Sequence, residues 1–305
     1  MLHAARNGGK PCAALPVPPP QLYWNSVLPN TPMPKSLSQL VKPDENALKY
    51  SKGADENAPF RYSNGADGNP PFKYSKDGSE NVTRAIFVSE KDLHLGTTMN
   101  YLLAGNSSIT IPFLSRNTVE LIPFSSSKLP EILNKFSVKP ESEAADMINN
   151  TIQGCELQGA RNEAKQCAAS LESMIDFATS TLGKNALAIA TEVDKKGADL
   201  KQKYTITIPG VKELAGNKFM LCHKMSYPYA VFYCHAIEKT RTYMVPLQGT
   251  DGTRAKAVAA CHENTSERNP NHYAFKELKV EPGTFPIYHF LEVEDVIWVP
   301  NQKPT

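Results

Sequence analysis

The sequence contains no apolar run of about 20 residues, the length that a helix needs to cross a bilayer. It also lacks a block of basic residues that could follow a phosphate backbone, and its 33 basic and 31 acidic residues nearly balance. We therefore predict neither a membrane span nor a nucleic-acid partner. Ser-His-Asp, HExxH, Walker and dinucleotide-binding motifs are missing too, so no familiar enzyme class is indicated.

The N-terminus lacks a complete export signal, because no apolar stretch of roughly 7–15 residues accompanies Arg6 and Lys10. We interpret residues 1–20 as an altered or incomplete N-terminus of a secreted precursor. Spaced cysteines favour export, since disulfide frameworks belong to oxidising compartments. N-x-S/T sequons add weaker support, at Asn81, Asn106, Asn149 and Asn264.

Prolines are concentrated in the first 75 residues. Residues 15–34 (LPVPPPQLYWNSVLPNTPMP) are predicted to be extended or polyproline-like rather than helical. A polar repeat follows, in which Tyr50, Tyr62 and Tyr74 recur at intervals of twelve residues. Units this polar cannot bury a core, so the Pro-rich segment and the repeats, residues 21–85, are predicted to form a flexible arm.

The ordered part, residues 86–305, is predicted to be α+β, with a helical segment followed by a mainly antiparallel sheet. Residues 141–182 are the one region with helical periodicity, interrupted at Gly154 and Gly159. Residues 86–103 and 107–114 have strand-like patterns. Further strands are predicted over 204–208, 218–225, 230–237, 241–247, 254–262, 273–280 and 286–300.

The strongest signal is a series of Cys-His dipeptides on these strands. Ten residues separate Cys222-His223 from Cys234-His235, and 25 residues separate that pair from Cys261-His262. After 25 more residues the series ends in Tyr288-His289. Three such dipeptides are improbable by chance among six cysteines and seven histidines.

A hairpin centred on Pro228 would place Cys222 directly opposite Cys234. Opposed strand residues have Cα atoms about 4.5–5.5 Å apart, which a disulfide tolerates. Neighbouring residues of a strand point to opposite faces, so His223 and His235 would share the other face, about 7–8 Å apart.

Two imidazoles at that separation can bind one metal ion, and His262 and His289 on later strands can complete a set of nitrogen ligands. Such a set favours Cu(II), with Zn(II) the alternative for a tetrahedral site. The other interpretation is that the cysteines staple a sheet and the histidines are surface or hydrogen-bonded residues without a metal. His94 and His272 are interpreted as loop or packing residues outside the site.

Cys155 and Cys167 are a second candidate disulfide. On one continuous helix they would lie about 18 Å apart, so the bridge requires a turn around residues 158–162 (QGARN). Cys261 would face Tyr288 and remain a free thiol.

The last 220 residues resemble the BURP domain, whose signature is CH-x10-CH-x25–27-CH-x25–26-CH. FVSEKDLHLGTTMN is similar to the domain's opening, CELQGARNEAKQCAASLESMIDFATSTLG to its helical segment, and NPNHYAFKELKVEPGTFPIYHFLEVEDVIWVP to its closing stretch. YWNSVLPNTPMPKSL (residues 23–37) resembles the segment that follows the signal peptide in this family. The chain departs from the pattern at Tyr288, where the family's last cysteine is missing.

The resemblance implies a plant protein exported to the apoplast or cell wall, related to stress or development, with a cell-wall polysaccharide or wall enzyme as partner. It implies copper ligands at His223, His235, His262 and His289. A non-enzymatic role is the main expectation. The alternative is a copper-dependent cyclase that cross-links its own arm, with acceptors Tyr50, Tyr62, Tyr74, Tyr23 and Trp24; these tyrosines can equally be spacers.

Overall fold

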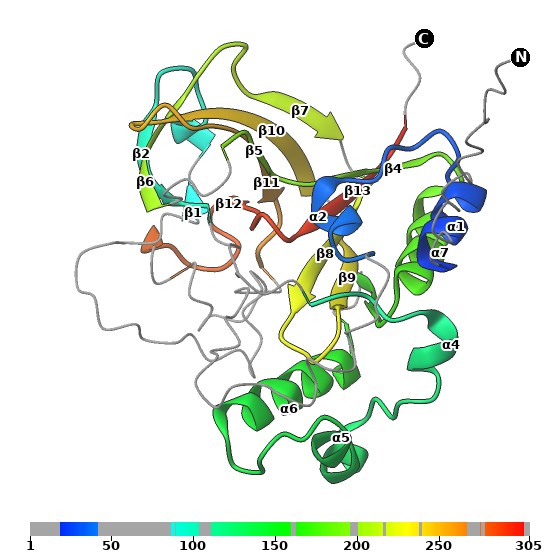
Figure 1. Ribbon diagram of the computed structural model, residues 1–305. Coiled ribbons are helices and arrows are strands. Elements are labelled where there is room, and N and C mark those ends of the chain that lie inside the picture. Colours follow the sequence, from blue (N-terminus) through cyan, green and yellow to red (C-terminus); the bar gives the residue numbers. More distant parts are fainter. Residues whose placement is uncertain are drawn as a thin grey trace, which may run out of the picture.

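The computed structural model describes residues 19–41, 87–88, 90–103, 111–159, 163–195, 201–215, 218–237, 240–266, 275 and 278–301. Within them the chain forms two antiparallel sheets with helices around them (Figure 1), which confirms the predicted α+β class. No helix in these stretches is long and apolar enough to span a membrane.

The larger sheet has the strand order β1-β12-β11-β10-β6-β2, with β5 beside β11 and β7 beside β10. Its long central hairpin, β10–β11, runs from the pair Thr240–His262 to the pair Gln248–Arg254. Its strands are β1 (Phe87–Val88), β2 (Thr98–Leu102), β5 (Glu192–Val193), β6 (Lys201–Ile206), β7 (Lys212–Ala215), β10 (Thr240–Gly249), β11 (Arg254–His262) and β12 (Ile287–Phe290).

The smaller sheet has the order β3-β9-β8-β13-β4. Met225 pairs with Val231, so the β8–β9 hairpin turns around Pro228 as predicted. Its strands are β3 (Glu163–Ala168), β4 (Ala186–Ile189), β8 (Met220–Met225), β9 (Val231–Ile237) and β13 (Val296–Pro300).

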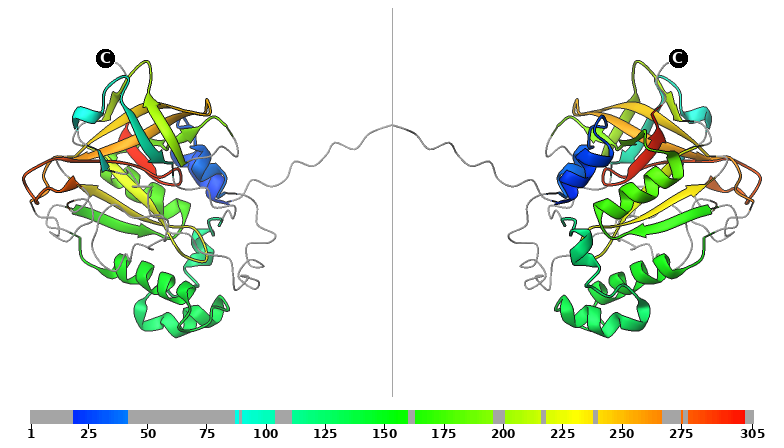
Figure 2. Two further views of the ribbon diagram at one scale, coloured as in Figure 1. Left: turned by 90° about the vertical axis from the view of Figure 1, so that its left-hand side faces the viewer. Right: turned by 90° about the vertical axis from the view of Figure 1, so that its right-hand side faces the viewer.

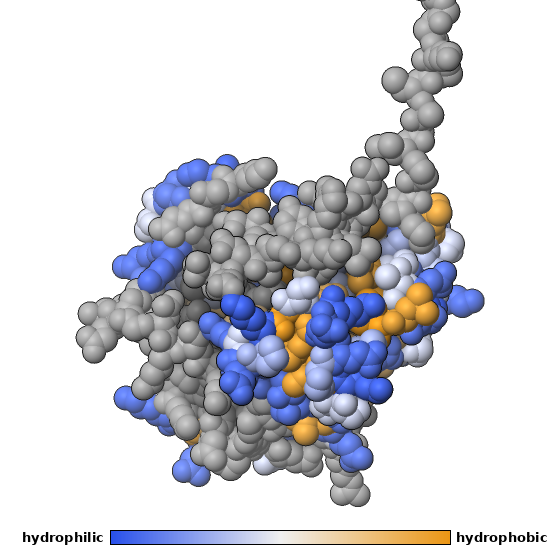
Figure 3. All heavy atoms as spheres, turned by 60° about the horizontal axis from the view of Figure 1, so that its bottom comes forward, coloured by the Kyte–Doolittle hydropathy of each residue, from blue (hydrophilic) through white to orange (hydrophobic). Residues whose placement is uncertain are grey.

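Helices cover the outside of the sheets, with α1 lying along α7 on one side and α5 and α6 together at one end (Figures 1 and 2). Viewed from below, the described surface is mostly hydrophilic with smaller hydrophobic areas (Figure 3). The helices are α1 (Pro19–Val27), α2 (Lys35–Ser38), α4 (Arg116–Val119), α5 (Leu129–Lys135), α6 (Glu143–Glu156) and α7 (Leu171–Leu182), with 3-10 turns η1 (Glu90–Asp92) and η2 (Ser126–Lys128).

The two sheets face each other across an apolar inter-sheet layer. Its buried members come from both sheets and comprise Phe219, Leu221, Val258, Ala260, Leu291, Ile297 and Val299. The opposite face of the smaller sheet packs on α1 and α7 through Cys222, Cys234 and Trp298. The opposite face of the larger sheet forms another core with Cys261 and Tyr288. In each Cys-His dipeptide, the cysteine therefore lies on the face away from the inter-sheet layer, and the histidine points toward that layer.

The helical region predicted over 141–182 contains a strand. Helix α6 ends at Glu156, and β3 pairs with β9 before α7 begins. Ser170 explains that second start, because its hydroxyl accepts a hydrogen bond from Ser173 N at 3.1 Å as an N-cap. Gly183, with φ of 91°, ends the helix. Ala168, inside the predicted helical region, is a buried strand residue.

The run predicted as one strand over 286–300 is two strands of different sheets. β12 belongs to the larger sheet and β13 to the smaller, and residues 291–295 cross between them. The strand predicted over 273–280 is also wrong at Phe275 and Leu278, which are helical. Residues 111–114, the described part of the strand expected over 107–114, are not a strand.

The extended conformation predicted for residues 15–34 is wrong over α1. Pro19 and Pro20 stand at the first helical positions, where a missing backbone N–H disrupts nothing. Residues 19–41, the docked segment, are not a flexible arm either, since Trp24, Leu28 and Leu37 are buried in the core. The repeats with Tyr50, Tyr62 and Tyr74 lie outside the described residues.

Candidate metal centre

The β8–β9 hairpin positions the first two Cys-His dipeptides as predicted. Cys222 pairs directly with Cys234 at a Cα–Cα distance of 4.0 Å, and the two form a disulfide. His223 and His235 are diagonal neighbours on the other face, with ring centroids 5.4 Å apart. Both imidazoles are buried.

Each of these imidazoles is held by a carboxylate from a distant segment. His223 Nδ1 lies 3.0 Å from Asp295 Oδ2, and His235 Nδ1 lies 2.9 Å from Glu163 Oε1. A carboxylate can only accept at these distances, so Nδ1 carries the proton in both rings. In the neutral imidazole, Nε2 is then the nitrogen with the lone pair, the atom through which such a histidine binds a metal.

Asp295 is fixed by the crossing between the sheets. Its carboxylate accepts hydrogen bonds from Lys224 N at 3.2 Å and Glu292 N at 3.3 Å, in addition to its contact with His223. Glu163, the first residue of β3, lies 3.5 Å from the hydroxyl of Tyr233, which pairs with His223 across the hairpin. Neither carboxylate was identified from the sequence.

His262 and His289 form the second pair, on β11 and β12. Their Nε2 atoms are 3.1 Å apart and their rings are stacked, with centroids 5.2 Å apart. Thr240 Oγ1 lies 3.3 Å from His262 Nδ1. Two nitrogens this close can both reach one ion at a bond length of about 2.0–2.1 Å.

The register places both pairs on the inter-sheet layer. His235 pairs with Leu221 and His289 pairs with Ala260, and Leu221 and Ala260 pack in the same cluster. Within the part of the chain that the structure describes, no group of three or more His, Cys, Asp or Glu side chains is gathered to hold a metal. The four histidines therefore stand as two pairs and not as one assembled four-nitrogen site.

The donor set nevertheless fits a copper ion chemically. All four imidazoles are buried, and two of them are oriented by carboxylates whose negative charge would compensate a bound cation. Nitrogen-rich sites of this kind suit Cu(II) better than the other common divalent ions.

The BURP domain matches residues 86–300 of the chain. That stretch covers both sheets, the three Cys-His dipeptides and Tyr288-His289. The chain belongs to the BURP-domain family. BURP domain protein RD22 of Arabidopsis thaliana is 50% identical over 217 residues, which is 70% of this chain and 55% of that protein. BURP domain-containing protein 5 of Oryza sativa subsp. japonica is 39% identical over 302 residues, 97% of this chain and 90% of that protein.

The BURP chain also contains the second expected disulfide. Cys155 in the last turn of α6 bonds to Cys167 in β3, with Cα atoms 5.6 Å apart. The strand between the helices allows this bridge, which a continuous helix would not. Of the two histidines placed outside the site, His94 is an exposed loop residue that contacts Thr97, and His272 lies outside the described residues.

Cys261 is a buried free thiol directly opposite Tyr288. Burial raises the pKa of this thiol to about 11, so it stays protonated at physiological pH. Cys261 and Tyr288 hold the same relation on β11 and β12 as Cys222 and Cys234 on β8 and β9, as residues paired across two strands.

Replacing Tyr288 with cysteine should therefore create a third disulfide. The expected result is that Cys261 escapes alkylation by iodoacetamide in the oxidised, denatured Tyr288→Cys protein, whereas Cys261 of the unaltered chain is alkylated. Tyr243→Cys is the matched control, because Tyr243 pairs with Ala259 and not with Cys261. Peptide mass spectrometry should find Cys261 alkylated in that control, and an alkylated Cys261 in Tyr288→Cys would contradict the register argument.

Proposed function

We propose that this BURP protein is a copper-binding protein of the plant secretory pathway that acts by binding rather than by catalysis. The observation that carries this proposal is the carboxylate on Nδ1 of both His223 and His235. This arrangement directs both Nε2 lone pairs away from the carboxylates and favours ligation of a cation.

The role of each pair follows from its surroundings. His223 and His235 have charged partners, so they would supply the more strongly donating nitrogens. His262 and His289 would supply two closely spaced nitrogens. A bound copper ion would add a strong Lewis acid that can change oxidation state. The chain itself supplies a buried layer that restricts water around the ligands.

Two disulfides support the secretory part of the proposal, because such bridges persist in oxidising compartments. The apoplast or cell wall is the compartment we propose, and a wall polysaccharide or wall enzyme remains the predicted partner.

The alternative function, a cyclase that modifies its own chain, gains no support from Tyr23 and Trp24. Trp24 is buried on the face of the smaller sheet that carries the cysteines, opposite to His223 and His235. Tyr23 donates a hydrogen bond to Asp176 on α7. In the folded chain these two residues stabilise the core and do not reach the histidines.

Copper titration of the oxidised full-length protein tests the proposal. We expect tight Cu(II) binding, weaker Zn(II) binding, and a loss of tight copper binding in His223→Ala and in His235→Ala. His94→Ala is the control, since His94 is exposed and lies outside both pairs. Equal copper affinity in His235→Ala and the unaltered protein would contradict the proposal.

A further inference from the structure

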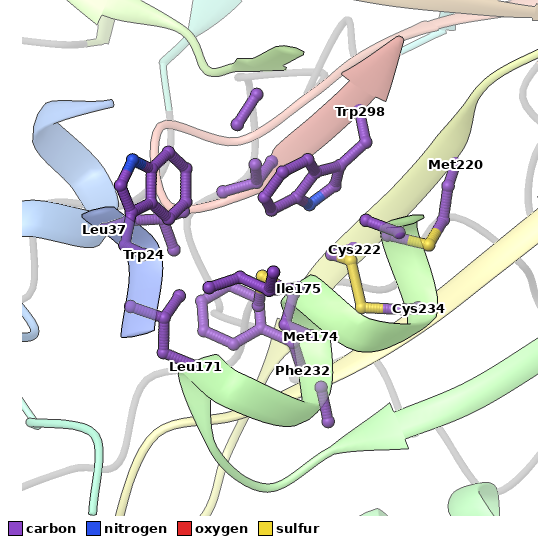
Figure 4. Packing of buried hydrophobic residues seen from close by; sticks show 14 of the residues in the cluster. Trp24, Leu37, Leu171, Met174, Ile175, Met220, Cys222, Phe232, Cys234 and Trp298 are labelled. Atoms are coloured by element: carbon purple, nitrogen blue, oxygen red, sulfur yellow. A yellow bond between two sulfur atoms is a disulfide. The ribbon is translucent and has the colours of Figure 1, made fainter. Parts of the chain in front are cut away.

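The docked segment contributes to the core although it lies outside the matched BURP domain, which begins at residue 86. Trp24 packs on Trp298 with ring centroids 5.5 Å apart (Figure 4), and its Nε1 donates to Thr31 O at 2.9 Å. Leu37 is fully buried beside them. In the same view, Leu171 and Ile175 of α7 pack in the same cluster as the two tryptophans.

Polar contacts also hold the docked segment against the domain. Tyr23 donates its hydroxyl to Asp176, and Arg116 Nη2 binds the other oxygen of that carboxylate at 2.6 Å. The Arg116 guanidinium also lies 5.3 Å from the centre of the Tyr23 ring. These three groups come from α1, α4 and α7, so they join the segment to two helices of the domain.

Two further contacts fix the later part of the segment. Thr31 Oγ1 donates to Ala186 O at 3.1 Å, and Leu40 O accepts from Phe113 N at 2.8 Å. The apolar and polar contacts thus cover the segment from Tyr23 to Leu40, and each of these partners in the domain lies beyond residue 110.

We propose that residues 19–41 bind the BURP domain as a separable ligand, against a surface formed by Phe113, Asp176, Ala186 and Trp298. The covalent link through residues 42–85 then raises the local concentration of the segment without being needed to hold it. A chain cut within 42–85 would remain a two-piece complex, and both ends of the repeat arm would stay attached to the domain.

The test is to cut the folded full-length chain. A site-specific protease sequence is inserted after Gly68, and the cut protein is run at about 1 µM on a sizing column. We expect the fragment that contains residues 19–41 to elute with the BURP domain. Its separate elution would overturn the proposal.

Two variants of the cut chain test whether the segment itself holds the complex. Trp24→Ala should release the N-terminal fragment, whereas Leu22→Ala, on the exposed side of α1, should leave it bound. Tyr23→Phe keeps the ring and removes only the bond to Asp176, so we expect about a tenfold weaker complex. Co-elution that persists unchanged in both Trp24→Ala and Tyr23→Phe would contradict the assigned contacts.

Discussion

Trp24→Ala is expected to lower the free energy of unfolding by about 3–5 kcal/mol, because it empties a large space in a packed core. Trp24 is 2% exposed and packs, with other residues of the docked segment, against α7 and β13. Urea unfolding of the oxidised protein, followed by circular dichroism, measures the change.

Leu22→Ala is the matched control, since Leu22 belongs to the same helix but is 54% exposed. It should change the free energy of unfolding by no more than about 0.5 kcal/mol. If Trp24→Ala is as stable as Leu22→Ala, the docked segment does not contribute to the core. The N-terminal boundary of the folded domain then lies at residue 86, where the BURP match begins.

Glu163→Gln and Asp295→Asn are expected to weaken Cu(II) binding by about 10–100-fold each, the range found for residues that orient metal ligands. The Glu163→Gln side chain retains an acceptor for His235 and loses only the charge. The Asp295→Asn side chain also loses one of two oxygens that accept backbone N–H groups. The effect of Asp295→Asn should therefore be the larger.

Glu294→Gln is the control for this pair of variants. Glu294 neighbours Asp295 in the crossing segment, but its carboxylate binds Lys224 and not a histidine. We expect its copper affinity to match that of the unaltered protein. Unchanged affinity in both Glu163→Gln and Asp295→Asn would show that these carboxylates stabilise the fold alone and do not act on the ligands.

The hairpin that carries the first histidine pair could be predicted closely from the sequence. A short turn around Pro228 fixes the register, and the register fixes which face each residue occupies. The same alternation placed the histidines of β11 and β12 together. Local pattern was sufficient here because the partners are close in sequence or lie on adjacent strands.

The carboxylates could not be predicted, because Glu163 and Asp295 each lie 72 residues from the histidine that they hold. No local periodicity reports such a contact. The docked segment was missed for another reason. Its prolines favour extended backbone on average. The helix that starts at Pro19 is stabilised by tertiary packing, in which Trp24 is buried against Trp298.

The crossing at residues 291–295 was also hidden. Residues 286–300 are mostly apolar or β-branched, and the segment between the two strands holds Glu292, Glu294 and Asp295 but neither glycine nor proline. The break follows from the tertiary structure, in which β12 and β13 belong to different sheets.

X-ray absorption spectroscopy of the copper-loaded, oxidised full-length protein is the most direct test of the central claim. The account predicts a first shell with imidazole nitrogens, and fewer of them in His223→Ala and in His262→Ala. If the imidazole signal of both variants equals that of the unaltered protein, the account is contradicted. A purified chain that binds no copper would contradict it as well.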